Sequence, residues 1–295
     1  MSGDDRELPR WAATSWLVGS LAVAQAMLLT AVSAAESGVV SLFASAGELA
    51  LAPALAAALG TWFAALAARE CGAGRMGQLV LALALLLSPR VAGLAVLAES
   101  SLPLVAPLAL WSQLRALRTA RPGPAVLCAA CALALGLGSP SGWLLALTIG
   151  AGLAGAGPRS FLSALATALA GYGLLVASGV APPSLEVGLT SFGWPWTSPL
   201  ALGLPLIALA GLAVLRLRSL SRWLRPFLAS MLAATALAAS IDPEVAYVPL
   251  LGLAGLGAGW IGAQAEVRGQ RAMAGLVVAV CGIGLALLPL FALPS

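Results

Sequence analysis

Apolar runs long enough to cross a lipid bilayer recur along this 295-residue chain from one end to the other. A transmembrane helix needs about 20 consecutive, mostly apolar residues, because the hydrocarbon layer is about 30 Å thick. Hydrophobic residues make up 61% of the chain and charged residues only 9%, whereas soluble domains carry about 25% charged residues. The pattern predicts an all-α fold, in which residues 1–295 form a single polytopic transmembrane domain without a separate soluble domain.

We expect about 10 to 11 transmembrane helices, separated by short polar loops. The spans cover residues 11–33, 49–68, 76–89, 102–117, 125–137, 143–156, 161–180, 199–215, 226–240, 245–263 and 272–293. The first run could also be a signal peptide, but its length and the acidic residues before it favour a retained helix. The shortest spans leave a second interpretation open, in which they are half-helices that do not cross the bilayer.

The distribution of arginine predicts the orientation of the chain. There are 15 basic residues, all of them arginine, and 11 acidic residues. If the short tail 1–10 is cytoplasmic, that tail and the cytoplasmic loops hold every arginine except Arg90, and cytoplasmic loops are where Lys and Arg concentrate. These loops cover 69–75, 115–123, 157–159, 216–225 and 264–271. We therefore expect a multi-pass protein of the cell inner (plasma) membrane, with outer-face loops that include 34–48 and 181–198.

The outer face receives six acids and one arginine, which together form the candidate site. The acids are Glu36, Glu48, Glu99, Glu186, Asp242 and Glu244. A carboxylate in a water-excluding crevice at the membrane surface can act as a general base or hold a metal ion. The guanidinium of Arg90 can bind a lipid-linked phosphate. The alternatives are acids that simply mark interfacial loops, as we expect for Glu48, and an arginine that snorkels to a headgroup.

Arg90 and Glu99 can share this site only if the helix breaks between them. They are nine residues apart, and on a continuous helix, at about 100° per residue, that spacing places them on opposite faces. Pro89 removes a backbone donor, and helices usually end or bend just before a proline. The sequence therefore predicts a broken surface segment after Pro89.

Other motifs predict packing and turns rather than chemistry. Histidine is absent, which excludes histidine bases, Ser-His-Asp triads and histidine-ligated metals. Cys128 and Cys131 have CxxC spacing inside an apolar helix, and residues 72–77 spell GxGxxG with no preceding strand. We expect buried thiols, a glycine-rich turn, and close helix packing at the GxxxG of residues 255–259. No cofactor, metal or nucleic-acid partner is indicated.

Several short motifs stand in an order typical of one family of membrane enzymes. An acid follows the first helix at Glu36, and a basic, glycine-containing turn covers residues 67–72. An apolar run then closes in Ser-Pro at residues 88–89, about ten residues before Glu99. A glycine-rich helix end at 135–142 and a helix start that reads Tyr247-Val248-Pro249-Leu250-Leu251 complete the order. Over residues 30–262 the chain resembles the GT-C superfamily of membrane glycosyltransferases, in particular relatives of protein O-mannosyltransferase and of the lipid A aminoarabinose transferase.

The resemblance implies transfer of a sugar from a polyprenyl-phosphate donor to an acceptor on the outer face. It implies that Glu36 activates the acceptor, that Glu99 is a second acid or a metal ligand, and that Arg90 contacts the donor phosphate. The chain departs from the family in the paired acidic motif of the first outer loop and in the lysine after the fifth helix, both of which are missing.

Two other functions fit the same sequence. One is a catalytically degenerate relative that serves as a structural or partner subunit of a membrane complex, which the low polarity and the Gly/Ala rows fit. The other is a transporter or flippase-like protein. Against the transporter, the expected spans contain almost no ionisable residues, which ion-coupled transport usually requires.

Overall fold

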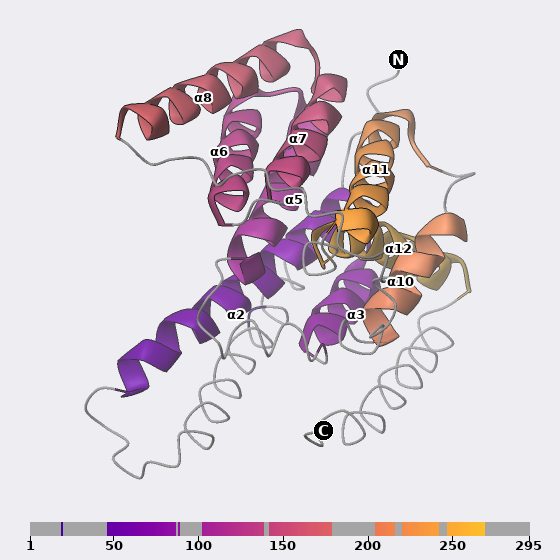
Figure 1. Ribbon diagram of the computed structural model, residues 1–295. Coiled ribbons are helices and arrows are strands. Elements are labelled where there is room, and N and C mark those ends of the chain that lie inside the picture. The colour runs from indigo at the N-terminus through magenta and orange to yellow at the C-terminus, as the bar shows by residue number, and fades with distance from the viewer. Residues whose placement is uncertain are drawn as a thin grey trace.

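The computed structural model describes residues 19, 46–86, 88, 102–138, 142–178, 204–215, 220–241 and 247–268. Every regular element in these ranges is a helix and none is a strand (Figure 1). The all-α class expected from the sequence is therefore confirmed for the part of the chain that the structure describes.

The helices follow the expected apolar runs closely, usually to within a few residues. They are α2 (Ala46–Glu70), α3 (Arg75–Leu86), α5 (Leu102–Thr119), α6 (Pro122–Gly138), α7 (Gly142–Gly152), α8 (Pro158–Ala177), α10 (Leu204–Leu215), α11 (Arg225–Ile241) and α12 (Tyr247–Arg268), with 3₁₀ turns η2 (Leu153–Ala156) and η5 (Arg222–Leu224). The expected spans 11–33 and 272–293 lie outside the described residues, except for residue 19. Because α2 begins at Ala46, the end of the predicted outer loop 34–48 is helical.

Helix α12 lies at the centre of one half of the molecule, in contact with α2, α3, α10 and α11 (Figure 1). Each of its residues from Tyr247 to Gly259 is buried. Glycine lets its backbone approach its neighbours closely, as is typical of helix pairs in membranes. A Cβ on Gly257 would overlap the carbonyl oxygen of Leu209 in α10, and a Cβ on Gly262 would lie 2.5 Å from the backbone nitrogen of Gly74.

A second set of contacts joins α2 to α5 and α5 to the layer of α6, α7 and α8. A Cβ on Gly60 of α2 would overlap the carbonyl oxygen of Pro103 in α5, so these two helices also pack backbone against backbone. Helix α8 is the outermost element of this layer and rests on α6, where Gly171 faces the side chain of Leu133 (Figure 1).

Among the described residues, α8 alone has the length and apolar character to cross a bilayer. Its 20 residues are almost all accessible, with 11% of the tested window buried. Leu162, Leu169 and Leu174 are 60%, 63% and 72% exposed. Three further apolar helical stretches of the described chain, Arg75–Leu86, Pro122–Leu137 and Ala146–Ala156, are shorter. A larger share of their residues is buried than in α8.

Substitution of Gly257 by alanine tests the close packing of α12. The new methyl group would overlap the Leu209 carbonyl, so we expect Gly257→Ala to lower the free energy of unfolding by about 1–3 kcal/mol. Gly211→Ala is the matched control on α10, because no atom lies within 4 Å of the added Cβ and alanine is the better helix former by about 1 kcal/mol. Thermal unfolding of the purified protein in detergent measures both. Equal unfolding temperatures for the two variants would contradict the packing.

Candidate functional site

The residues predicted to carry chemistry lie outside the described part of the chain. This applies to Glu36, Arg90 and Glu99, and also to the outer-face acids Glu186, Asp242 and Glu244. Glu48 falls in the first turn of α2. The predicted site therefore remains a prediction from sequence, and the described residues instead show the arginine-rich helix ends that the sequence assigns to the other face.

Helix ends from distant parts of the sequence meet on that arginine-rich face. The carboxylate of Glu70, at the end of α2, contacts Arg115 and Arg118 near the end of α5. The turn η2, which follows α7, packs against both α5 and α11: a Cβ on Gly155 would lie 3.1 Å from Leu117 and 2.5 Å from Pro226. The ends of α2, α5 and α7 and the start of α11 therefore lie together.

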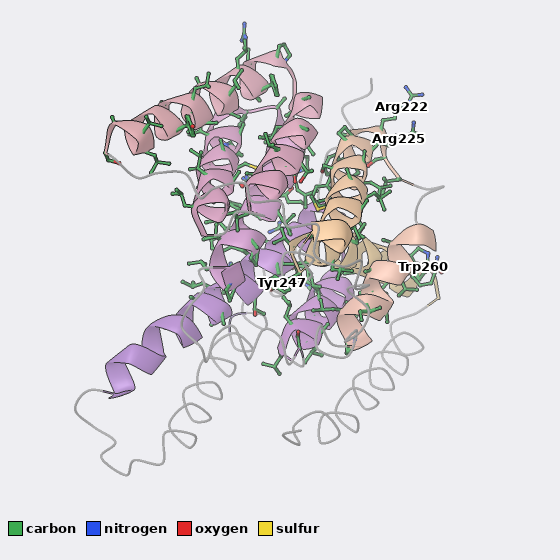
Figure 2. All side chains as sticks on the ribbon, viewed as in Figure 1. Arg222, Arg225, Tyr247 and Trp260 are labelled. Carbon is green, nitrogen blue, oxygen red and sulfur yellow. The ribbon has the colours of Figure 1, made fainter. Side chains whose placement is uncertain are left out.

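The other segments with described arginines lie next to these helix ends. Arg159 is in the first turn of α8, directly after η2. Arg75 begins α3, directly after the turn in which Gly74 contacts Gly262 of α12. Figure 2 shows Arg222 and Arg225 projecting outward where α11 begins. All arginines with described side chains belong to this region, which we call the arginine end: Arg69, Arg75, Arg115, Arg118, Arg121, Arg159, Arg222 and Arg225. They come from four of the five loops that the sequence assigns to the cytoplasm.

A buried ion cluster occupies the inner side of the arginine end. The side chain of Glu70 is only 3% exposed, whereas Arg118 is 16% and Arg115 42% exposed. Both arginines donate to Glu70 Oε1, Arg115 through Nη1 at 3.2 Å and Arg118 through Nη2 at 3.3 Å. The Nε of Arg118 also pairs with Glu70 Oε2. Two cations thus surround one carboxylate, which compensates for its burial.

Aromatic packing supports this cluster from the apolar side. The guanidinium of Arg115 lies 5.6 Å from the ring centroid of Trp111, one helical turn earlier in α5. Trp111 in turn packs against Phe63 of α2, with ring centroids 5.5 Å apart. Cation–π and aromatic contacts of this kind each contribute about 0.5–1.5 kcal/mol. They hold the α2–α5 pair in the register that the ion cluster requires.

A second polar contact lies deeper, where α5, α7 and α11 meet. Gln113 is fully buried, and its Nε2 donates to the carbonyl oxygen of Ile149 at 3.0 Å and to Oγ of Ser230 at 3.4 Å. Ser230 itself donates to the carbonyl oxygen of Phe227 at 2.8 Å. Side-chain hydrogen bonds between membrane helices stabilise their association by about 0.6 kcal/mol on average. This contact connects three helices rather than forming a site for chemistry.

The cysteine and glycine motifs have the structural roles that the sequence suggests. Cys128 and Cys131 are both buried in α6. The GxGxxG segment covers the turn between α2 and α3 and the first residues of α3. Gly72 in this turn has a φ of 81°, a conformation that favours glycine. Within the described ranges, no group of three or more His, Cys, Asp or Glu side chains is placed to hold a metal ion.

Sequence reasoning did not identify the Glu70 cluster or the Gln113 contact. Glu70 carried one signal, because it is an acid in a loop region otherwise rich in arginine. Gln113 carried a weaker one, as a polar residue within an apolar run. Neither signal names the partner, because the pairs are 45 and 117 residues apart in the chain.

In comparisons with known proteins, no protein-family model, no curated protein and no solved structure matches the chain. The resemblance to the GT-C superfamily therefore rests on the sequence motifs alone.

Replacing Glu70 by glutamine tests the ion cluster. The change leaves Arg118 largely buried beside a neutral group, and breaking one partner of a buried pair typically destabilises by about 3 kcal/mol. We expect a clearly lower unfolding temperature in detergent for Glu70→Gln, and partial recovery in the double variant Glu70→Gln/Arg118→Gln. Arg121→Gln removes an exposed arginine and serves as the control. A Glu70→Gln protein as stable as the control would show that the cluster contributes little.

Proposed function

We propose that this chain is a polytopic integral membrane protein that transfers a sugar from a polyprenyl-phosphate donor at the face opposite the arginine end. The observation that carries the membrane part is the gathering of arginines from four separate loops at one end of the helical body. Soluble proteins gather cations where they bind polyanions such as nucleic acids, whereas the arginines of this chain stand in short loops between apolar helices. A bilayer favours that arrangement, because a charge at its centre is unfavourable by about 2.5–3.5 kcal/mol on insertion scales.

The exposed apolar surface supports the same proposal. Helix α8 presents leucines along most of its length, and large exposed apolar surfaces mark contact with lipid or with another protein. Its 20 residues span about 30 Å at 1.5 Å per residue, which matches the thickness of the hydrocarbon layer. Lipid contact along α8 therefore requires no rearrangement of the helix.

The chemistry is proposed from the sequence motifs of the opposite face. In this proposal, Glu36 accepts the proton of the acceptor hydroxyl group as its oxygen attacks the anomeric carbon of the donor sugar. The bond from that carbon to the phosphate oxygen breaks, and polyprenyl phosphate leaves with its charge held by Arg90. Glu99 assists as a second acid or as a metal ligand. Proton transfer to a positioned carboxylate contributes typically about 10²–10⁴-fold in rate.

A partner subunit without catalysis is the second candidate. Three polar side chains of the interior, Glu70, Gln113 and Ser230, hydrogen-bond or pair with neighbouring helices. These residues serve helix packing. A chain that keeps this scaffold and lacks turnover would act through the proteins that it binds in the membrane.

The test is release of polyprenyl phosphate from a labelled polyprenyl-phosphate sugar by the purified protein. We expect Glu36→Gln and Glu99→Gln to reduce turnover by about 100-fold or more, and Arg90→Gln to raise the KM for the donor. Glu48→Gln is the matched control, because we expect Glu48 to be an ordinary interfacial acid, and its turnover should be unchanged. Absence of turnover in the wild-type protein, together with co-purification of a stable membrane complex, would favour the partner subunit.

A further inference from the structure

We propose that Arg159, Arg222 and Arg225 form a binding surface for the headgroup of an anionic phospholipid at the arginine end. This inference rests on the membrane part of the proposed function and is independent of sugar transfer. The three side chains are exposed. They come from two segments that the fold brings together, the start of α8 and the turn η5 with the first residue of α11. We call them the headgroup surface.

The local sequence fixes Arg222 and Arg225 on the outside of the turn. Leu220, Leu224 and Phe227 alternate with them and are buried at 7%, 2% and 0% exposure. With the apolar residues anchored in the core, the two guanidinium groups point away from the ribbon, as Figure 2 shows. The surface therefore needs little reorganisation to receive a ligand.

The turn η2 brings Arg159 to the same region. Gly155 packs against Pro226, the residue after Arg225, and its lack of a Cβ permits this approach. Arg159 follows four residues later, at the start of α8 and exposed. Two chain segments that are more than 60 residues apart in the sequence thus present exposed arginines at the same end of the molecule.

The headgroup surface carries three guanidinium groups, which are complementary to a phosphate. Phosphate oxygens accept paired hydrogen bonds from guanidinium groups. The half-buried Trp223 lies between Arg222 and Leu224, and indole rings are enriched at the level of lipid headgroups.

The exposed face of α8 identifies the ligand as a lipid rather than a free phosphate. From Arg159 the helix continues through Leu162 and Leu169, which are 60% and 63% exposed. A phospholipid whose phosphate meets the arginines can therefore lay its acyl chains along this face. A soluble phosphate ion would use only the charged part of the surface.

Titration of phosphatidylglycerol into the full-length protein in neutral detergent, read by native mass spectrometry, tests the proposal. Phosphatidylcholine provides the zwitterionic comparison, and inorganic phosphate added as a competitor distinguishes lipid from free anion. We expect Arg222→Gln/Arg225→Gln to weaken binding of phosphatidylglycerol at least about tenfold. Arg75→Gln/Arg121→Gln removes two arginines from the same end of the molecule and should change binding by less than about threefold.

Three results would overturn the inference. The first is an equal loss of phosphatidylglycerol binding in both double variants, which would indicate diffuse attraction. The second is binding of phosphatidylcholine as strong as that of phosphatidylglycerol. The third is full displacement of bound phosphatidylglycerol by millimolar inorganic phosphate. Incorporation of both double variants into phosphatidylcholine nanodiscs verifies that each one folds. Failure of the wild-type protein to enter nanodiscs would contradict the proposed membrane function as well, whereas entry without specific lipid binding contradicts this inference alone.

Discussion

In the bilayer setting proposed above, the unfavourable transfer of charge into lipid explains where the described arginines lie. Arginines from loops far apart in the sequence gather at one end, and the helices between them bury mostly apolar side chains with a few neutral polar ones. Glu70 is the charged exception, because its carboxylate is only 3% exposed. Its contacts with Arg115 and Arg118 show how the fold accommodates such a group, with two cations around one anion and an aromatic layer beneath them.

Close contact between helix backbones holds the described helices together. Lipid tails are as apolar as leucine side chains, so burial of leucine alone does not drive helices to associate in a bilayer. The contacts of Gly60, Gly257 and Gly262 instead bring backbones into direct contact. The buried hydrogen bonds of Gln113 add a specific registration among α5, α7 and α11. Backbone contacts at the glycines therefore hold helix pairs together, and the hydrogen bonds of Gln113 align the three helices that meet around it.

The sequence predicted the helices well and the polar contacts poorly. Long apolar runs leave a chain little choice but helix, which is why α5 and α11 coincide closely with their expected spans. The described arginines come from four loops that loop parity assigns to one face, and their helix ends do lie at one end of the helical body. Which side of a membrane that end occupies stays a prediction. The pairing of Glu70 with Arg115 depends on how α2 and α5 pack, and no local pattern encodes that. The outer-face residues Glu36, Arg90 and Glu99 lie outside the described ranges, so their geometry is still a prediction.

The most direct test of the central claim is accessibility labelling in intact cells with a membrane-impermeant maleimide. The wild-type protein gives the baseline for its native cysteines. Single replacements Ser221→Cys, beside Arg222 at the arginine end, and Ser100→Cys, beside Glu99, mark the two faces. We expect Ser100→Cys to react in intact cells and Ser221→Cys to react only after the membrane is permeabilised. Labelling of both positions from the same side would contradict it.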